Sequence, residues 1–137
     1  MALPDKLIIF LGRTCSGHHH DSLMLKQEWP PGLAWFADLH VRVDLGYLGI
    51  KADDRAEQIA IPTKTPRKSQ KNPNPPWSDA QKAANKALSQ IRIFMEHAMG
   101  GMKRSKILVH AFRNRLENFE DDVIGVCAGL WNFVLSY

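Results

Sequence analysis

The chain has few of the features that mark an exported, disulfide-bonded or membrane-spanning protein. Its 137 residues include only two cysteines, Cys15 and Cys127, near opposite ends of the sequence, and we therefore expect reduced thiols rather than a disulfide framework. The apolar run Leu7–Leu11 is far too short to cross a bilayer, and no cleavable signal follows it. Because 45% of the residues are hydrophobic and 23% are charged, the composition favours one globular, cytoplasmic domain with no membrane partner.

Acidic residues are scarce across the middle of the chain. Between Ile59 and Met95 the only acidic residue is Asp79, whereas basic residues accumulate there: Lys64, Arg67, Lys68, Lys71, Lys82, Lys86 and Arg92. The formal net charge of the whole chain is +4. A basic excess of this size permits a polyanionic partner without requiring one.

The first half of the chain has the pattern of a mixed α/β protein. The run Leu7–Leu11, closed by Gly12, predicts a buried strand. A short helix is expected from Asp21 or Ser22 to about Glu28. The segment 33–43 predicts a strand that ends at Asp44 before a glycine turn, and a third, short strand at 59–62 is expected to stop at its proline.

Two helices are expected in the second half. Ser78 and Gln81 form a capping box, and an apolar stripe then continues at helical spacing: Ala84, Ala87, Leu88, Ile91, Phe94, Met95, Ala98, Met99 and Met102. About 25 residues would make a helix of roughly 37 Å, loosened or ended by Gly100 and Gly101. A last helix, from about Phe119 to Leu135, is expected to bury Val123, Ile124, Val126, Cys127, Leu130, Trp131 and Val134.

Two acidic residues have the setting of metal ligands. Asp44 follows the second expected strand and Glu96 lies on the long helix, and distant carboxylates of this kind can hold divalent metal ions in nucleases. On a helical wheel Arg92 and Lys103 lie about 40° and 20° from Glu96, so that the three share a face. Each acid also has an ordinary explanation, since aspartate is common in turns and glutamate in solvated helical ion pairs.

Several segments, taken in order, resemble the C-terminal part of insertion-sequence transposases of the DDE superfamily. The residues that carry the resemblance are Asp44-Leu-Gly-Tyr-Leu-Gly, then Pro62 to Lys68, Ser78 to Lys86, Arg92 to Arg104, and Ala128 to Phe133. The stretch Gly17-His18-His19-His20-Asp21 is similar to the Gly-x-x-His-Asp loop of these enzymes. Asp21 is not one of the family's three metal carboxylates, although it could approach the site.

The resemblance implies an RNase H-like fold in which three carboxylates hold two divalent ions, Mg²⁺ or Mn²⁺, for cutting and joining phosphodiester bonds. By motif, Asp44 matches the second carboxylate and Glu96, on the long helix, the third. The residues expected to meet DNA phosphates are Lys64, Arg67, Lys68, Arg92, Lys103 and Arg104. The expected DNA is that of transposon ends.

No residue matches the first carboxylate of the family. It belongs to a first strand upstream of the segment that Leu7–Leu11 resembles, and Asp5 has no strand to sit on. We therefore expect residues 1–137 to be a truncated catalytic domain, a partial RNase H-like fold without its first two strands, inactive alone. The upstream half of a split transposase, or an intact transposase, would complete it. A non-catalytic DNA-binding or regulatory remnant is the alternative, and a protein-interaction module a third possibility.

Overall fold

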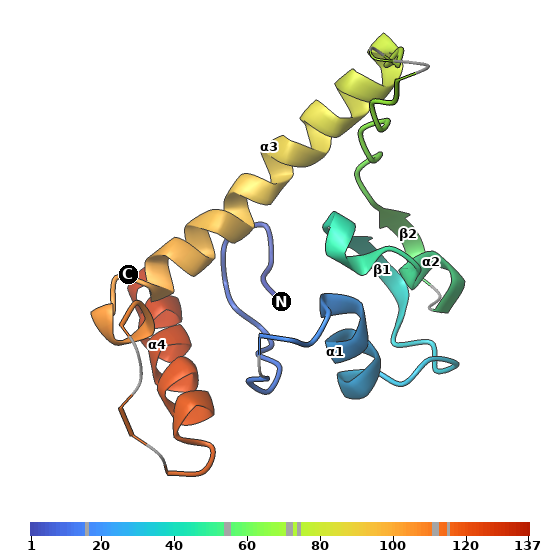
Figure 1. Cartoon of the computed structure of the whole chain (residues 1–137). Coiled ribbons are helices and arrows are strands. Elements are labelled where there is room, and N and C mark those ends of the chain that lie inside the picture. Colours follow the sequence, from blue (N-terminus) through green and yellow to red (C-terminus); the bar gives the residue numbers. More distant parts are fainter. Residues whose placement is uncertain (16, 54–55, 71–72, 74, 111–112, 115) are drawn as a thin grey trace. The chain divides into compact units, whose positions relative to one another are not determined.

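The chain forms four α-helices and a two-stranded sheet over the residues that the structure describes. The computed structural model describes residues 1–15, 17–53, 56–70, 73, 75–110, 113–114 and 116–137. The elements, drawn in Figure 1, are α1 (Asp21–Glu28), β1 (Phe36–Arg42), the 3-10 turn η1 (Leu45–Tyr47), α2 (Ile50–Asp53), β2 (Ala56–Ala60), α3 (Asp79–Met102), the 3-10 turn η2 (Lys106–Leu108) and α4 (Phe119–Leu135). The expected mixed α/β class is confirmed.

The elements group into two compact units. One unit comprises Met1–Ser16 and Gln90–Tyr137, and the other comprises Gly17–Ser89. The helix α3 contributes its first part to the unit 17–89 and the rest to the other. Among the described residues, no helix is both long and apolar enough to span a membrane.

The unit 17–89 is built around a small parallel sheet. β1 and β2 pair with Phe36 opposite Ala56 and Arg42 opposite Ala60, and the register shifts between Phe36 and His40. Trp29, just after α1, makes an edge contact with Phe36 at 5.7 Å between ring centroids. The expected strand before Asp44 is confirmed, and it ends two residues before Asp44. The expected third strand lies earlier than predicted, because Ala60 is its last paired residue and Pro62 has no N–H to continue the ladder.

The long helix begins where the capping box predicts. The Ser78 Oγ accepts from the Gln81 backbone N–H at 3.2 Å, and the Gln81 Oε1 accepts from the Ser78 N–H at 3.2 Å. The helix then continues to Met102, through both glycines that were expected to loosen or end it. The predicted bounds of the last helix are confirmed residue for residue as Phe119–Leu135.

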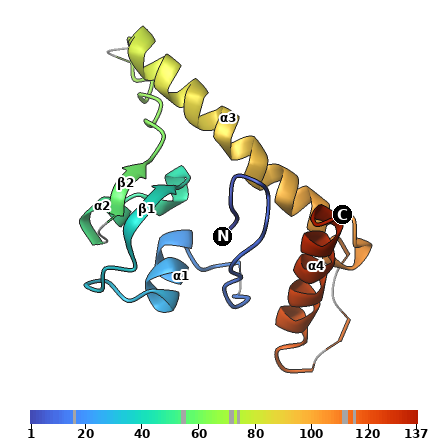
Figure 2. The ribbon, with the colours of Figure 1, turned by 180° about the vertical axis from the view of Figure 1, so that it is seen from behind.

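The helices α3 and α4 meet at the C-terminal end of α3, where Figure 2 shows them side by side from behind. The core of this unit consists of Met102, Cys127 and Ala128, with five half-buried apolar residues packed against it: Ile8, Leu108, Val123, Ile124 and Trp131. At Gly101 a Cβ would run into the Trp131 ring, so only glycine permits this approach. The prediction that Val126, Leu130 and Val134 are buried is wrong, since they are 62%, 57% and 58% exposed. They lie on α4 positions away from this contact, which covers only one side of the helix.

The N-terminal apolar run does not form the predicted strand. Only Ile8 pairs, in an isolated antiparallel bridge with Ala2. Lys6 has φ of 74° and reverses the chain there, so that the Ile9 N–H donates to the Met1 carbonyl oxygen at 3.1 Å. The prediction of a buried strand at Leu7–Leu11 is therefore wrong. The run lies against the chain terminus, and Ile9 is 55% exposed.

Side chains of α4 hold the N-terminal segment in the way that a neighbouring strand would. The Ile8 N–H donates to Asn132 Oδ1 at 2.9 Å, and Asn132 Nδ2 donates to the Ile8 carbonyl oxygen at 2.8 Å. The Trp131 Nε1–H donates to the Lys6 carbonyl oxygen at 3.0 Å. Backbone groups that would need a sheet partner are thus satisfied by an amide and an indole.

Candidate metal and nucleic-acid site

Asp44 lies just beyond the carboxyl end of β1. The backbone of Val43 still follows the sheet, since its N–H donates to the Ala60 carbonyl oxygen at 3.2 Å. The half-buried Asp44 then begins η1, and its Oδ1 accepts from the Leu45 N–H at 2.7 Å. Parallel strands present their carboxyl ends at one edge of a sheet, where ligand-binding groups commonly gather in open α/β sheets. The carboxylate of Asp44 therefore lies at the carboxyl-end edge of this sheet.

Asp21, at the start of α1, approaches the same turn. A Cβ on Gly46 would meet the Asp21 carboxylate, so the glycine at this position gives the carboxylate room. The pKa of Tyr47 is raised above its usual value, first by burial and then by the negative charges of Asp21 and Asp44. The carboxylates of Asp21 and Asp44 thus both contribute to the raised pKa of Tyr47 at this turn. The resemblance predicts that Asp21 can approach the site, but no local signal in the sequence places it beside Gly46.

Replacing Asp21 with asparagine should lower the pKa of Tyr47, because one of the two charges that disfavour the phenolate is removed. The phenolate absorbance, titrated in a Tyr137→Phe background, reports Tyr47 alone. A raised pKa favours the neutral phenol in the folded state, so stability falls as the pH rises above about 10, and it should fall less steeply in Asp21→Asn. An unchanged Tyr47 titration would show that Asp21 does not act on this turn.

Glu96 lies in the last third of α3, in the other unit. Its side chain is 67% exposed, and its Oε1 is 3.9 Å from Arg92 Nη2, one helical turn earlier. Arg92 and Glu96 form an ion pair, which confirms that they share a face of the helix. A pair this exposed contributes little to stability.

Lys103 and Arg104 come directly after the last turn of α3, and both are exposed. The Arg104 guanidinium carbon is 5.8 Å from the centroid of the Trp131 ring. This cation–π contact fixes the arginine stem against α4 and keeps its charge at the surface. A positioned arginine of this kind suits a phosphate group.

The basic segment after β2 has no regular secondary structure, and its basic side chains are exposed. Lys64, Arg67 and Lys68 lie in a stretch without regular structure, and all three are exposed. Its backbone is tied to α3 at Thr63, whose N–H donates to Asn85 Oδ1 at 2.9 Å and whose carbonyl oxygen accepts from Asn85 Nδ2 at 2.9 Å. Lys71, the end of the loop expected to meet phosphates, lies outside the described residues.

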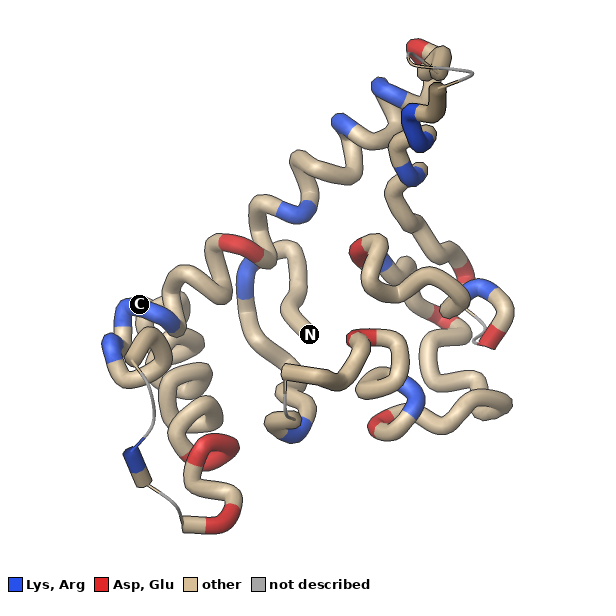
Figure 3. Tube along the Cα trace, in the orientation of Figure 1, with Lys and Arg blue, Asp and Glu red and all other residues tan. Residues whose placement is uncertain are grey.

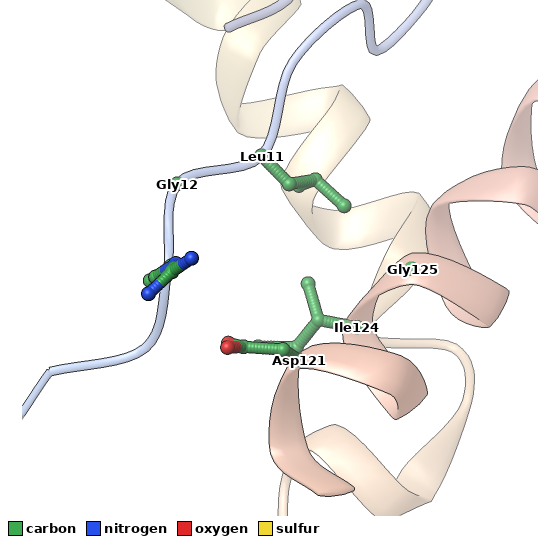
Figure 4. A pocket seen from close by; sticks show the side chains of 6 residues that line it. Leu11, Gly12, Asp121, Ile124 and Gly125 are labelled. Atoms are coloured by element: carbon green, nitrogen blue, oxygen red, sulfur yellow. The ribbon is translucent and has the colours of Figure 1, made fainter. Parts of the chain in front are cut away.

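A pocket in the unit formed by Met1–Ser16 and Gln90–Tyr137 contains none of the predicted site residues. Figure 4 shows it between the N-terminal segment and the start of α4, lined by Leu11, Gly12, Arg13, Asp121, Ile124 and Gly125. Asp121 Oδ1 accepts from the Thr14 N–H at 2.7 Å, and this hydrogen bond, helped by the charge of Arg13, lowers the pKa of Asp121. The carboxylate is therefore used to hold the N-terminal segment.

The predicted site residues fall into separate groups. Asp44 belongs to the unit 17–89, together with Lys64, Arg67 and Lys68, whereas Arg92, Glu96, Lys103 and Arg104 belong to the other unit. Within the described parts of the chain, no group of three or more His, Cys, Asp or Glu side chains could hold a metal ion. Asp44 and Glu96 offer oxygen atoms only, which is the donor set that a hard divalent ion prefers.

Comparison with known proteins agrees with the resemblance found in the sequence. A family model described as DDE superfamily endonuclease matches residues 1–132, which is nearly the whole chain. No curated protein and no solved structure gives a significant match. DDE endonucleases act on DNA and generally use divalent metal ions. With Asp44 beyond a parallel strand, Glu96 on the long helix and a family match over residues 1–132, this chain belongs to the DDE superfamily endonucleases.

Proposed function

We propose that this chain is the C-terminal part of a DDE-type transposase, and that Asp44 and Glu96 are two of its three metal-binding carboxylates. The observation that supports this most directly is the half-buried position of Asp44 beyond the carboxyl end of β1, in a chain of this family. Mg²⁺ or Mn²⁺ is the proposed metal. When bound, such ions activate the attacking oxygen and stabilise the leaving oxygen of a phosphodiester.

The basic residues have a separate role in this proposal. Arg92 lies beside Glu96, and Lys103 and Arg104 follow at the end of α3. Together with Lys64, Arg67 and Lys68 they would bind the phosphates of transposon-end DNA. Such contacts position the DNA strand without reading its sequence.

We further propose that another polypeptide segment supplies the third carboxylate within an RNase H-like sheet that includes β1 and β2. A two-stranded sheet is marginal by itself, and Phe36 is the only buried residue of its two strands. Apolar side chains are also exposed on α3, where Phe94, Met95 and Met99 are 38%, 39% and 52% exposed. Further strands would cover such surface and stabilise the fold. The upstream half of a split transposase, or an intact transposase, is the proposed source.

The test is cleavage of transposon-end DNA with Mg²⁺, by this chain alone and together with the polypeptide encoded upstream. We expect cleavage only in the second case. Cleavage by the chain alone would contradict the need for a third carboxylate from elsewhere. Absence of cleavage in both cases, with DNA still bound, would favour the alternative below.

A non-catalytic DNA-binding or regulatory role is the second candidate. The ion pair between Arg92 and Glu96 favours it, because an exposed helical pair of this kind needs no metal to explain it. In that case DNA binding should persist without Mg²⁺ and after Glu96→Ala. The chain would then compete for transposon ends or form mixed complexes with intact transposase.

A further inference from the structure

Two segments leave the parallel sheet at the same edge. Arg42 pairs with Ala60, and the chain continues from β1 to Asp44 and from β2 to Thr63. At no more than about 3.6 Å per residue, Lys64 lies within roughly 14 Å of the end of β2. The basic segment therefore begins near the strand end that carries the proposed metal ligand.

A single side chain fixes the start of this segment. Asn85, half-buried on α3, donates to and accepts from the backbone of Thr63, with both distances at 2.9 Å. We call this pair of hydrogen bonds the Asn85 clamp. Pro62 and Pro66 fix their own φ angles near about −65°, and each disfavours the helical conformation for the residue before it, Ile61 and Thr65. The clamp thus sets the position of Lys64 relative to the first turns of α3, within one compact unit.

Two further lysines lie beside the clamp. On a helical wheel Lys82 and Lys86 are about 60° and 100° from Asn85, on the same side of it. Both are exposed. Lys82 Nζ is 3.0 Å from Asp79 Oδ1, but the Asp79 side chain is 97% exposed, so this pair is weak in water. Figure 3 shows basic positions on both the segment after β2 and the first half of α3.

We infer that Lys82 and Lys86, with the clamped segment Lys64–Lys68, form a binding element for the phosphate backbone of DNA, and that Asn85 is its positioning residue. The inference rests on the proposed function, since it identifies DNA as the polyanion. It adds Lys82, Lys86 and Asn85 to the residues that contact or organise DNA. The element would guide a strand toward the sheet edge at Asp44.

The spacing of the charges suits a nucleic-acid strand. From Lys64 to Lys68 the extended chain spans at most about 14 Å, and one DNA strand carries a phosphate about every 3.4 Å of helix axis. Within residues 61–95 only Asp79 opposes these cations. Exposed cations spread along a segment that is held at Thr63 can follow a line of phosphates, whereas a compact anion would need convergent donors.

The experiment measures binding of a fluorescein-labelled DNA duplex to the whole chain across a salt series, in EDTA so that no metal takes part. Each lost phosphate contact reduces the slope of log K against log salt by about 0.9. The double variant Lys82→Gln/Lys86→Gln should therefore reduce the slope by about one to two. Asn85→Ala should also reduce it although no charge is lost, because the segment from Thr63 is released.

The matched control is Lys51→Gln, which removes an exposed lysine from α2 in the same unit and should leave the slope unchanged. Because alanine is a better helix former than asparagine, helicity measured by circular dichroism should be retained in Asn85→Ala. In that background, changing Lys64, Arg67 and Lys68 to glutamine should alter the slope less than in the native chain, as expected for coupled residues.

If either Lys82→Gln/Lys86→Gln or Asn85→Ala shows the same slope of log K against log salt as the unchanged chain, the inference is overturned. Unlabelled DNA should displace the labelled duplex better than poly-glutamate at the same total charge. If the two compete equally, the element binds acidic polymers in general, and the inference is overturned. Because the assay contains no metal, these failures are distinct from a failure of the metal-dependent cleavage. Loss of cleavage in Asp44 or Glu96 variants would leave the binding element intact.

Discussion

Replacing Asp44 with asparagine is expected to reduce metal-dependent DNA cleavage on the order of 10³-fold, measured with the upstream polypeptide present. A metal ion contributes several kcal/mol of transition-state stabilisation, and each 1.4 kcal/mol is about tenfold in rate. Asparagine retains an oxygen that can accept from the Leu45 N–H, now at 2.7 Å from Asp44 Oδ1. The turn should therefore stay folded while the charge that binds metal is lost.

Glu96→Gln should have a comparable effect on cleavage and little effect on stability. The side chain is 67% exposed, and its pair with Arg92 contributes little in water. Glu57→Gln is the matched control, because Glu57 is a carboxylate of similar exposure, at 63%, that has no proposed role at the metal. Full activity in Asp44→Asn would contradict the role of Asp44 as a metal ligand. A loss of activity in Glu57→Gln as large as that in Glu96→Gln would contradict the role of Glu96.

Adding one methyl group at Gly101 and at Gly100 is expected to have opposite effects on stability. At Gly101 the new Cβ would run into the Trp131 ring, whereas at Gly100 it would meet nothing within 4 Å. Overpacking of this kind typically destabilises by about 1–3 kcal/mol. Gly100→Ala should instead stabilise by up to about 1 kcal/mol, because alanine favours the helix over glycine. Thermal and urea unfolding of the two variants measure the difference directly.

The Trp131 ring cannot easily move to accept the extra atom. Its Nε1 is hydrogen-bonded to the Lys6 carbonyl oxygen at 3.0 Å, and Arg104 lies 5.8 Å from its centroid. The same contact holds the end of α3, where Lys103 and Arg104 are exposed. Gly101→Ala should therefore also weaken DNA binding if those residues meet phosphates. Equal stability of the two alanine variants would show that α3 and α4 do not pack through Gly101.

Local signals in the sequence were sufficient for several elements. The capping box at Ser78 and Gln81 and the apolar period that follows it predict α3, because helix initiation depends on residues three or four apart. The bounds of α4 and the strand before Asp44 follow from similar short-range patterns. The motifs around Asp44 and Glu96 also indicate the family that the comparison confirms. Metal binding by these two residues stays a prediction.

What the sequence alone could not decide involves partners far apart in the chain. Leu7–Leu11 has the composition of a buried strand, but Asn132, 124 positions from Ile8, takes the backbone hydrogen bonds that a strand would need. The proximity of Asp21 to Gly46 and the Asn85 clamp on Thr63 likewise have no local signature. The sequence by itself determined α1, α3, α4 and the family through short-range spacing, although it did not indicate α2. The tertiary structure decided which side chains contact backbone groups and charges, because those contacts depend on how distant segments pack.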